Sequence, residues 1–359
     1  MNRTTSTPSV TPGVRLGTLS FVWRPRAVLV TFLLTAATFP AFCLSIGVGD
    51  FSLSFSQVVS VLLGQGERVD RFVVMDLRMP RALAGLVVGA ALGLSGALTQ
   101  SLARNPLASP DILGVTGGAS MVAVFLVTVS GGASTVIAGA FGLSVAALVG
   151  GLGTGLLVYL LAWRQGIDGF RLVLIGIAVS AVTQAVTTWL LTTADIRDVA
   201  RAQAWLVGSL DNRSWDEVGT ATWGALALAL AVTALSFPLK AMQLGDDVAT
   251  GLGVRPGPVR AALLLCAVLL AGVAVSAAGP VPFVALVAPH VAMRLVKAPV
   301  PPLVASGAVG ALLLIGADLA ARTALPIVPP VGVVTAAVGG PFLVYLLVQA
   351  NRRSVLNFR

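Results

Sequence analysis

The sequence predicts an all-α integral membrane protein with about ten transmembrane helices, and three observations support that fold class. Apolar residues make up 57% of the 359 residues, whereas charged residues make up only 10%. The mean hydropathy is +0.95. A soluble chain of this length would need far more charge to cover its surface. Runs of about 20 apolar residues, long enough to cross a bilayer core of about 30 Å, recur along the whole chain.

Ten of these runs are expected to span the membrane, and nothing divides them into separate domains. They cover residues 27–47, 78–102, 112–130, 134–162, 171–193, 218–236, 260–278, 281–296, 301–320 and 331–349. The eighth is the shortest and contains Pro282 and Pro289. Residues 1–26 are polar and rich in Ser, Thr and Pro, so a disordered arm is expected before a helical domain of residues 27–350. Residues 351–359 form a tail.

The distribution of charge predicts the orientation of the chain. With the N-terminus inside, 15 of the 23 basic residues fall in cytoplasmic segments against 4 acidic residues, and the outside receives 8 basic and 10 acidic residues. Cytoplasmic loops of membrane proteins carry an excess of Lys and Arg. Both termini are therefore expected in the cytoplasm, and the net charge of +9 reflects membrane topology rather than binding of nucleic acid.

The second run carries charge only in its first turn. Arg78 and Arg81 lie one helical turn apart at its outer mouth, where they either snorkel to lipid headgroups or form a positive patch for an acidic partner. Gly85, Gly89 and Gly93 follow at four-residue spacing. In lipid, small residues at this spacing allow another helix to approach closely. This helix is therefore expected to be buried in a bundle.

Few polar residues fall inside the spans. Gln100, Gln184 and Thr187 are candidates for lining a transport pathway, although polar contacts between helices explain them equally well. Asp318 precedes Arg322 by four residues, a spacing that predicts a local ion pair. The spans hold no chain of carboxylates of the kind that proton-coupled carriers use. This absence counts against a proton-driven secondary transporter but leaves a sodium-coupled one open.

The sequence offers no catalytic constellation. A phosphate-binding loop needs a glycine-rich motif ending in Lys and Ser or Thr, but Lys240 and Lys297 are each followed by Ala. His290 is the only histidine and has no Cys or carboxylate near it in sequence, so no metal site is expected. The chain is therefore predicted not to be an enzyme. If it transports actively, its energy source lies on another chain.

The longest well-charged cytoplasmic loop covers residues 238–260. Asp246 and Asp247 favour the start of a short helix, because acidic residues stabilise a helix N-terminus. Gly251 and Gly253 then end that helix. A short helix outside the membrane is a natural docking element for a cytoplasmic motor, although an ordinary connecting loop explains the same residues.

Four ordered motifs carry a family resemblance. They are "RMPRALAGLVVGAALGLSGALTQSLARNPLASPDILGV", "LGDDVATGLGV", "GPVPFVALVAPHVAMRLV" and "PPVGVVTAAVGGPFLVYLL". Together they resemble the permease family of ABC importers for iron–siderophores, haem and vitamin B12, over about residues 27–350. Within it, "TQSLARNPLASPDILG", "LLAWRQGIDGFRLVLIGIAV" and "ALVAPH" are most similar to one permease subunit of ferric-enterobactin-type importers.

The resemblance implies a vitamin-B12-importer-like permease of a type II ABC importer, in the cytoplasmic membrane of a bacterium. Such a permease moves ferric siderophore inward by alternating access. It pairs with a second, related permease subunit, two ATPase subunits that use the ATP, and an extracytoplasmic siderophore-binding protein. The permease itself binds no cofactor. A haem or vitamin B12 permease is the alternative, and a secondary transporter is a more distant one.

The resemblance also assigns roles to residues at the two ends of the bundle. Arginines at the outer mouth are implied to receive acidic groups of the binding protein; they match Arg78, Arg81 and Arg322. Residues of the cytoplasmic loop are implied to contact the ATPase; they match Asp246, Asp247, Gly251 and Gly253.

Overall fold

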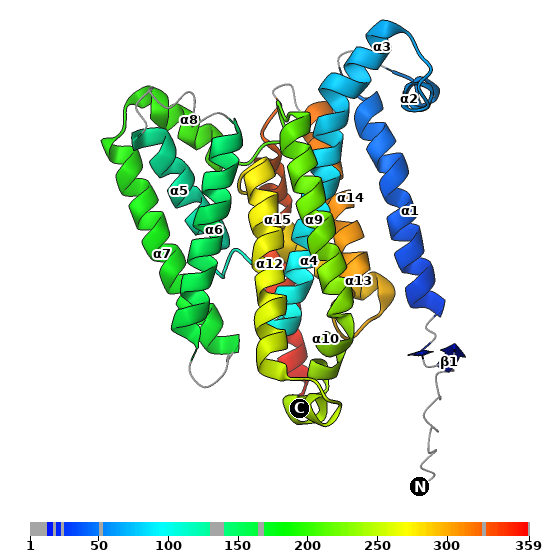
Figure 1. The fold of residues 1–359 in the computed structure, drawn as a ribbon, viewed down its shortest axis with the longest axis vertical. Helices are drawn as coiled ribbons and strands as arrows, with labels where there is room; N and C mark the ends of the chain where they lie inside the picture. The colour runs from blue at the N-terminus through cyan, green and yellow to red at the C-terminus, as the bar shows by residue number, and fades with distance from the viewer. Residues whose placement is uncertain are drawn as a thin grey trace.

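The structure is a computed structural model that describes residues 13–16, 19–22, 25–49, 53–129, 140–163, 169–324 and 328–357. Within these ranges, ten long or apolar helices form a bundle about one long axis (Figure 1). They are α1 (Pro25–Gly47), α4 (Met79–Ala103), α5 (Val115–Val129), α6 (Ala140–Ala162), α7 (Gly169–Thr193), α9 (Trp215–Ala234), α12 (Pro256–Ala278), α13 (Val284–Val296), α14 (Leu303–Thr323) and α15 (Val331–Asn357).

Each of these helices corresponds to one expected span. Seven are long and apolar enough to cross a membrane, namely α1, α4, α6, α7, α9, α12 and α14. The apolar stretches of α5, α13 and α15 are shorter. The predicted all-α integral membrane fold is therefore confirmed, although residues 134–139 of the fourth predicted span lie outside the described residues. The tail does not form a separate segment as far as Asn357, because α15 continues through it.

The remaining elements are short and connect the long helices. They are β1 (Gly13–Leu16), β2 (Leu19–Val22), α2 (Phe55–Leu62), α3 (Arg68–Phe72), the π-helix η1 (Val73–Arg78), α8 (Ile196–Leu206), α10 (Ser236–Gln243) and α11 (Asp246–Gly251). The start of α1 and the end of α15 lie at the end of the bundle that carries α10 and α11, whereas α2, α3 and α8 lie at the opposite end (Figure 1). We call these the α11 end and the α8 end.

Two short strands lie within residues 1–26, the segment predicted to be a disordered arm. β1 and β2 pair antiparallel, with Leu16 opposite Leu19 and Gly13 opposite Val22. Both segments contain β-branched, Leu or Phe residues, which favour extended pairing over a fully solvated chain. Residues 1–12 lie outside the described residues.

α4 is the central helix of the bundle. Of its most apolar stretch 78% is buried, against 17% for α7. Its neighbours include α9, α12, α13 and α14. A Cβ atom on Gly89 or Gly93 would clash with the carbonyl oxygens of Gly310 and Ser306 on α14. Because only glycine permits this backbone contact, the two helices approach closely along that face.

The other two glycines on α4 differ from one another. A Cβ on Gly85 would meet the side chain of Leu210 at 3.3 Å, a tight contact that a flexible side chain can relieve. Gly96, which breaks the four-residue spacing, faces the backbone of Ala285 on α13 and leaves no room for a Cβ. The sequence therefore identified two of the three closest contacts and missed the one that lies against a different helix.

η1 gives α4 an irregular start. Pro80 has no N–H and cannot bond to the carbonyl four residues back, so the helical register is interrupted there. Met79 donates its N–H to the carbonyl of Val74, five residues back, which is the π-helical pattern. α3, η1 and α4 together form one continuous 36-residue stretch from Arg68 to Ala103.

Candidate functional site: outer mouth, coupling segment and internal cavity

Two arginines at the α8 end converge on one buried carboxylate. Arg81 Nη2 lies 2.7 Å from Asp318 Oδ1, and Arg322 Nη2 lies 3.0 Å from Asp318 Oδ2. The side chain of Asp318 is only 3% exposed. α4 supplies Arg81 in its first turn, and α14 supplies the other two residues near its end. The local Asp318–Arg322 ion pair predicted from spacing is confirmed, and Arg81 joins it from another helix.

Two more polar residues bind these arginines, and sequence reasoning missed both. Asp211, in the loop between α8 and α9, accepts a hydrogen bond from Nη1 of Arg81. Ser45 on α1 accepts one from Nη2 of Arg322 at 2.9 Å. These partners are 130 and 277 residues apart in sequence. Helical spacing relates only residues within a turn or two, so it could not reveal either pair.

The end of α1 binds the arginines through its backbone. Arg78 Nη1 donates to the carbonyl of Ile46 at 2.9 Å, and Arg322 Nη1 donates to that of Val48 at 2.9 Å. The last carbonyls of a helix lack intrahelical partners and carry partial negative charge, so cations stabilise them. α1 is therefore tied to α4 and α14 at this end.

This arrangement places Arg78, Arg81 and Arg322 together, but partly buried. The side chains of Arg81 and Arg322 are 20% and 12% exposed, and each already has carboxylate or carbonyl partners. We call Arg78, Arg81, Asp211, Asp318 and Arg322 the mouth cluster. A docking role for its arginines stays a prediction.

At the other end, the predicted short helix is confirmed. α11 begins at Asp246 and ends at Gly251, with Gly253 after it at a φ of +80°. A short helix, α10, precedes it and was not expected. Gly245 joins the two at a φ of +114°, a conformation that side chains other than glycine rarely adopt. We call α10, α11 and the turn between them the coupling segment.

The coupling segment has one buried face and one exposed face. Ala241, Met242, Ala249 and Val254 pack together as a small buried cluster. On the outside, three large apolar side chains are exposed, namely Leu244, Val248 and Leu252. Val248 lies within α11, whereas Leu244 ends α10 and Leu252 follows α11. Exposed apolar side chains on a segment outside the bundle indicate a protein contact surface. Gly251 and Gly253 lie in open space beside it.

α4 connects the mouth cluster to the coupling segment. Its first turn holds Arg81, and its C-cap is Arg104, in a left-handed conformation at a φ of +47°. Arg104 donates to the carbonyl of Met242 at 3.0 Å and lies 3.5 Å from the carboxylate of Asp246. Arg260 on α12 also pairs with Asp246, at 2.9 Å. A single buried helix therefore contacts both charged ends of the molecule.

A cavity of about 850 Å³ lies between the 107–116 segment, α13 and α15. Its lining is mostly apolar and includes Pro282, Phe283 and Val333. Asp111 and Thr116 supply polar groups, and the hydroxyl of Thr116 donates to the Asp111 carboxylate. Burial raises the pKa of the Asp111 carboxyl, and this hydrogen bond lowers it in part. Sequence reasoning missed the place of Asp111 on the cavity wall.

The three residues expected to line a transport pathway lie away from this cavity. Gln100 is buried on α4 and donates to the carbonyl of Leu286 at 3.1 Å. Thr187 is buried on α7, and its hydroxyl donates to the carbonyl of Thr183 at 2.8 Å. Gln184 lies on the exposed face of α7. None of the three lines the 850 Å³ cavity.

His290 has a structural contact. One ring nitrogen lies 2.7 Å from the carbonyl oxygen of Pro106, in the loop after α4. Among the described residues, no group of three or more His, Cys, Asp or Glu side chains is arranged to hold a metal ion.

Comparison with known proteins decides the family. Residues 34–349 match the model of the FecCD transport family. The chain belongs to the FecCD transport family. The resemblance inferred from the four motifs, to permeases of iron–siderophore ABC importers, is thereby confirmed.

Curated members of the family cover nearly all of the chain. The ferric enterobactin transport system permease protein FepG of Escherichia coli is 40% identical over 92% of this chain and 99% of its own length. The achromobactin transport system permease protein CbrC of Dickeya dadantii is 41% identical over 85% and 87%. The iron(3+)-hydroxamate import system permease protein FhuG of Bacillus subtilis is 37% identical over 91% and 98%.

A solved structure shares the same architecture. It is an inward-facing conformation of a putative metal-chelate type ABC transporter, with 27% sequence identity and a TM-score of 0.78. The match covers 90% of this chain and 99% of that one. The FecCD chain described here is thus a multi-pass membrane permease of the kind that works with other ABC components.

Proposed function

We propose that this permease moves ferric siderophores inward as one subunit of a binding-protein-dependent ABC importer. The observation that carries the proposal is the continuity of α4 from the mouth cluster to the coupling segment. A transporter driven from the cytoplasm needs a rigid link between the side that receives energy and the side that receives substrate. The names of the curated relatives support iron chelates as the substrate class.

The proposal includes three kinds of protein partner. An extracytoplasmic siderophore-binding protein docks at the mouth cluster through acidic groups. Two ATPase subunits bind the coupling segments and hydrolyse the ATP, so the permease needs no cofactor and performs no covalent chemistry. A second, related permease subunit closes the open side of the 850 Å³ cavity. The importer lies in the cytoplasmic membrane of a bacterium with both termini of the permease in the cytoplasm.

In this mechanism, ATP binding moves the coupling segment against the end of α4. The contacts of Arg104 with Met242 and Asp246 pass that movement into the bundle. The bundle then alternates its opening between the two sides of the membrane. A cycle of this kind requires that the partners contact the two conformations differently, since equal contacts could not bias the equilibrium.

The first test is uptake by cells that lack this permease and by the same cells complemented with it. Labelled iron is supplied as catecholate and hydroxamate siderophores and as haem, with labelled cobalamin in parallel. Loss and restoration for one iron–siderophore class supports the proposal. Loss for haem or cobalamin alone supports the alternative permease functions. Uptake that persists without any partner ATPase favours a secondary transporter.

The coupling role is tested with Val248→Asp, which puts a charge among the exposed apolar side chains of the coupling segment. We expect uptake and substrate-stimulated ATP hydrolysis to fall to background, because burying that charge against the ATPase is costly. Val248→Thr keeps the shape of the side chain without the charge and serves as the control. Normal uptake by Val248→Asp would contradict the coupling role.

The docking role is tested by measuring the affinity of the purified importer for its binding protein. Arg78→Gln is expected to weaken binding, and Arg78→Glu to weaken it further, because repulsion is added to the loss of attraction. Arg201→Glu, at the same end on α8 and 72% exposed, is the control. Equal affinities for all three variants would remove Arg78 from the docking surface.

A further inference from the structure

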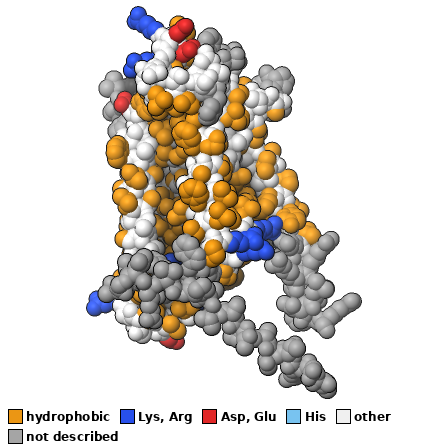
Figure 2. All heavy atoms as spheres, turned by 90° about the vertical axis from the view of Figure 1, so that its right-hand side faces the viewer, with side chains coloured by type: hydrophobic (Ala, Val, Ile, Leu, Met, Phe, Trp, Pro, Cys, Tyr) orange, Lys and Arg blue, Asp and Glu red, His pale blue; other side chains and the backbone are white. Residues whose placement is uncertain are grey.

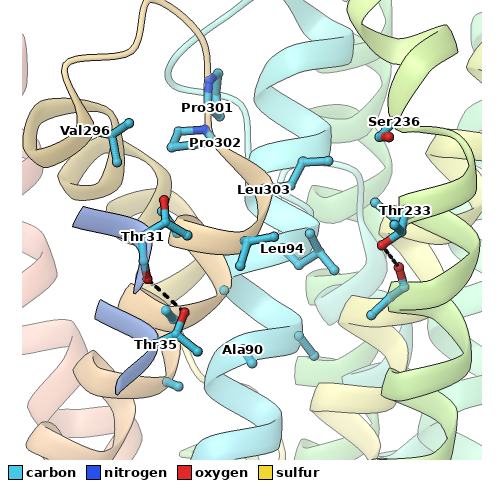
Figure 3. Close-up of a pocket in the computed structure, with 18 of the residues that line it drawn as sticks. Thr31, Thr35, Ala90, Leu94, Thr233, Ser236, Val296, Pro301, Pro302 and Leu303 are labelled. Atoms are coloured by element: carbon cyan, nitrogen blue, oxygen red, sulfur yellow. Dashed lines mark hydrogen bonds between the residues drawn. The ribbon is translucent and has the colours of Figure 1, made fainter. Parts of the chain in front are cut away.

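A second cavity lies on the outside of the bundle, apart from the cavity beside Asp111. It is a groove of about 760 Å³ and shares no residue with the 850 Å³ cavity. α1 and α9 form its two walls, and α4 and α14 form its floor (Figure 3). α10 and the segment of residues 298–302 line its end nearest α11.

The walls of the groove are apolar although they contain several threonines. Thr31, Thr35 and Thr38 lie on one face of α1, and Thr233 faces them from α9 (Figure 3). The hydroxyl of Thr35 donates to the carbonyl of Thr31 at 2.9 Å, and that of Thr233 donates to the carbonyl of Ala229 at 2.8 Å. Thr38 bonds to its own helix in the same way. The hydroxyls of Thr35, Thr38 and Thr233 therefore need no partner in the groove.

Small residues give the groove its depth. Its floor includes Ala90 on α4 and Gly307, Ala308 and Ala311 on α14. Longer side chains at these positions would fill the space. The close approach of α4 and α14 at Gly89 and Gly93 keeps this floor continuous.

Cations gather at the α11 end of the groove. Lys240 lines it, and no described acidic residue forms an ion pair with Lys240. Arg26 adjoins the lining residue Ala27, and Lys297 lies between two further lining residues. The nearby acid Asp246 is already paired with Arg260 and Arg104. A view of the α1 side shows Lys and Arg side chains at the lower edge of a broad hydrophobic surface (Figure 2).

We propose that this groove is a binding site for an anionic phospholipid, with one acyl chain along the floor and the phosphate at Lys240. At membrane depth an open apolar groove is in contact with lipid, and the unpaired cation at one end selects a negative headgroup. A purely apolar partner helix fits less well, because it would leave the charge of Lys240 without a partner. The proposal rests on the proposed function only for assigning the lipid to the cytoplasmic leaflet.

The site is tested on the full purified transporter in nanodiscs of phosphatidylcholine and phosphatidylglycerol. Native mass spectrometry measures which phospholipid stays bound after extraction. A phosphatidylglycerol with a photoreactive acyl chain then maps the contact. We expect labelled peptides from α1 and α9, and preferential retention of phosphatidylglycerol. Labelling of α1 and α9 no stronger than that of the exposed apolar face of α7 would overturn the proposal.

Two variants separate the headgroup from the chain. Lys240→Gln should lower the retained ratio of phosphatidylglycerol to phosphatidylcholine about fivefold, the contribution of one cation near a membrane surface. Ala90→Leu should reduce retention of both lipids by filling the floor. Arg171→Gln, at the same end but on α7, is the matched control. An unchanged ratio for Lys240→Gln overturns the site even if Ala90→Leu fails to fold. These experiments measure lipid binding and not transport. A negative result for the lipid site would therefore leave the proposed importer function unaffected.

Discussion

The two ends of the bundle use the same residue types, Arg and Asp, in opposite ways. At the α8 end, Asp318 is 3% exposed and is shared by Arg81 and Arg322. At the α11 end, Asp246 is 48% exposed and Arg104 is 60% exposed, although they too lie within ion-pair distance. Burial makes the ion pairs at the α8 end hard to separate, whereas solvent weakens those at the α11 end. The α8 end is therefore held together more tightly than the α11 end.

The largest difference between the two ends is expected when the buried carboxylate of Asp318 is removed. Asp318→Ala leaves two partly buried arginines without their shared partner. We expect it to lower the free energy of unfolding by about 3–5 kcal/mol, as removal of one member of a buried ion pair does. Thermal or denaturant unfolding of the purified permease measures the loss.

Asp211→Ala is the control for that variant, because Asp211 also pairs with Arg81 but its side chain is 45% exposed. Its cost should be about 1 kcal/mol or less. Equal losses for the two variants would mean that burial does not distinguish the members of the mouth cluster.

A smaller effect is expected in the helix that joins the two ends. In Gly93→Ala the new Cβ meets the backbone of Ser306 and Gly307, so α4 and α14 must separate. We expect a loss of about 1–3 kcal/mol, typical of overpacking. Gly153→Ala, on α6 with nothing within 4 Å of the new Cβ, should instead gain up to about 1 kcal/mol from helix propensity. If the unfolding midpoints of Gly93→Ala and Gly153→Ala move in the same direction, the α4–α14 contact is not rigid.

The smallest effect on stability is expected at the exposed end. Asp246→Asn removes the ion pairs with Arg260 and Arg104. Its cost should be about 0.2–1 kcal/mol and should shrink further in high salt, because exposed pairs are screened. Unfolding at low and high ionic strength measures both quantities. A loss as large as that of Asp318→Ala would show that the α11 end is held as tightly as the α8 end.

Much of the helix pattern could be predicted from apolar runs alone, because a bilayer demands about 20 apolar residues per crossing. Ten helices match the expected spans, and seven of them are long and apolar enough to cross a membrane. Some boundaries were missed despite a local signal. α9 starts at Trp215 rather than at 218, since Ser214 and Glu217 form a capping box ahead of the apolar run. α13 starts only at Val284, because Phe283 before it has a φ of +68°.

Composition and local spacing were enough to predict the fold class, the close contacts of Gly89 and Gly93, the Asp318–Arg322 pair and the position of α11. Each of these depends on residues within a few turns of one another or on overall composition. Three other features became visible only in the packed bundle. Arg81 joins Asp318 and Asp211, Arg78 and Arg322 cap α1, and α1 and α9 enclose a groove ending at Lys240. Those features bring together residues from distant helices. Helical spacing carries no information about such pairs, because packing between helices decides which faces meet.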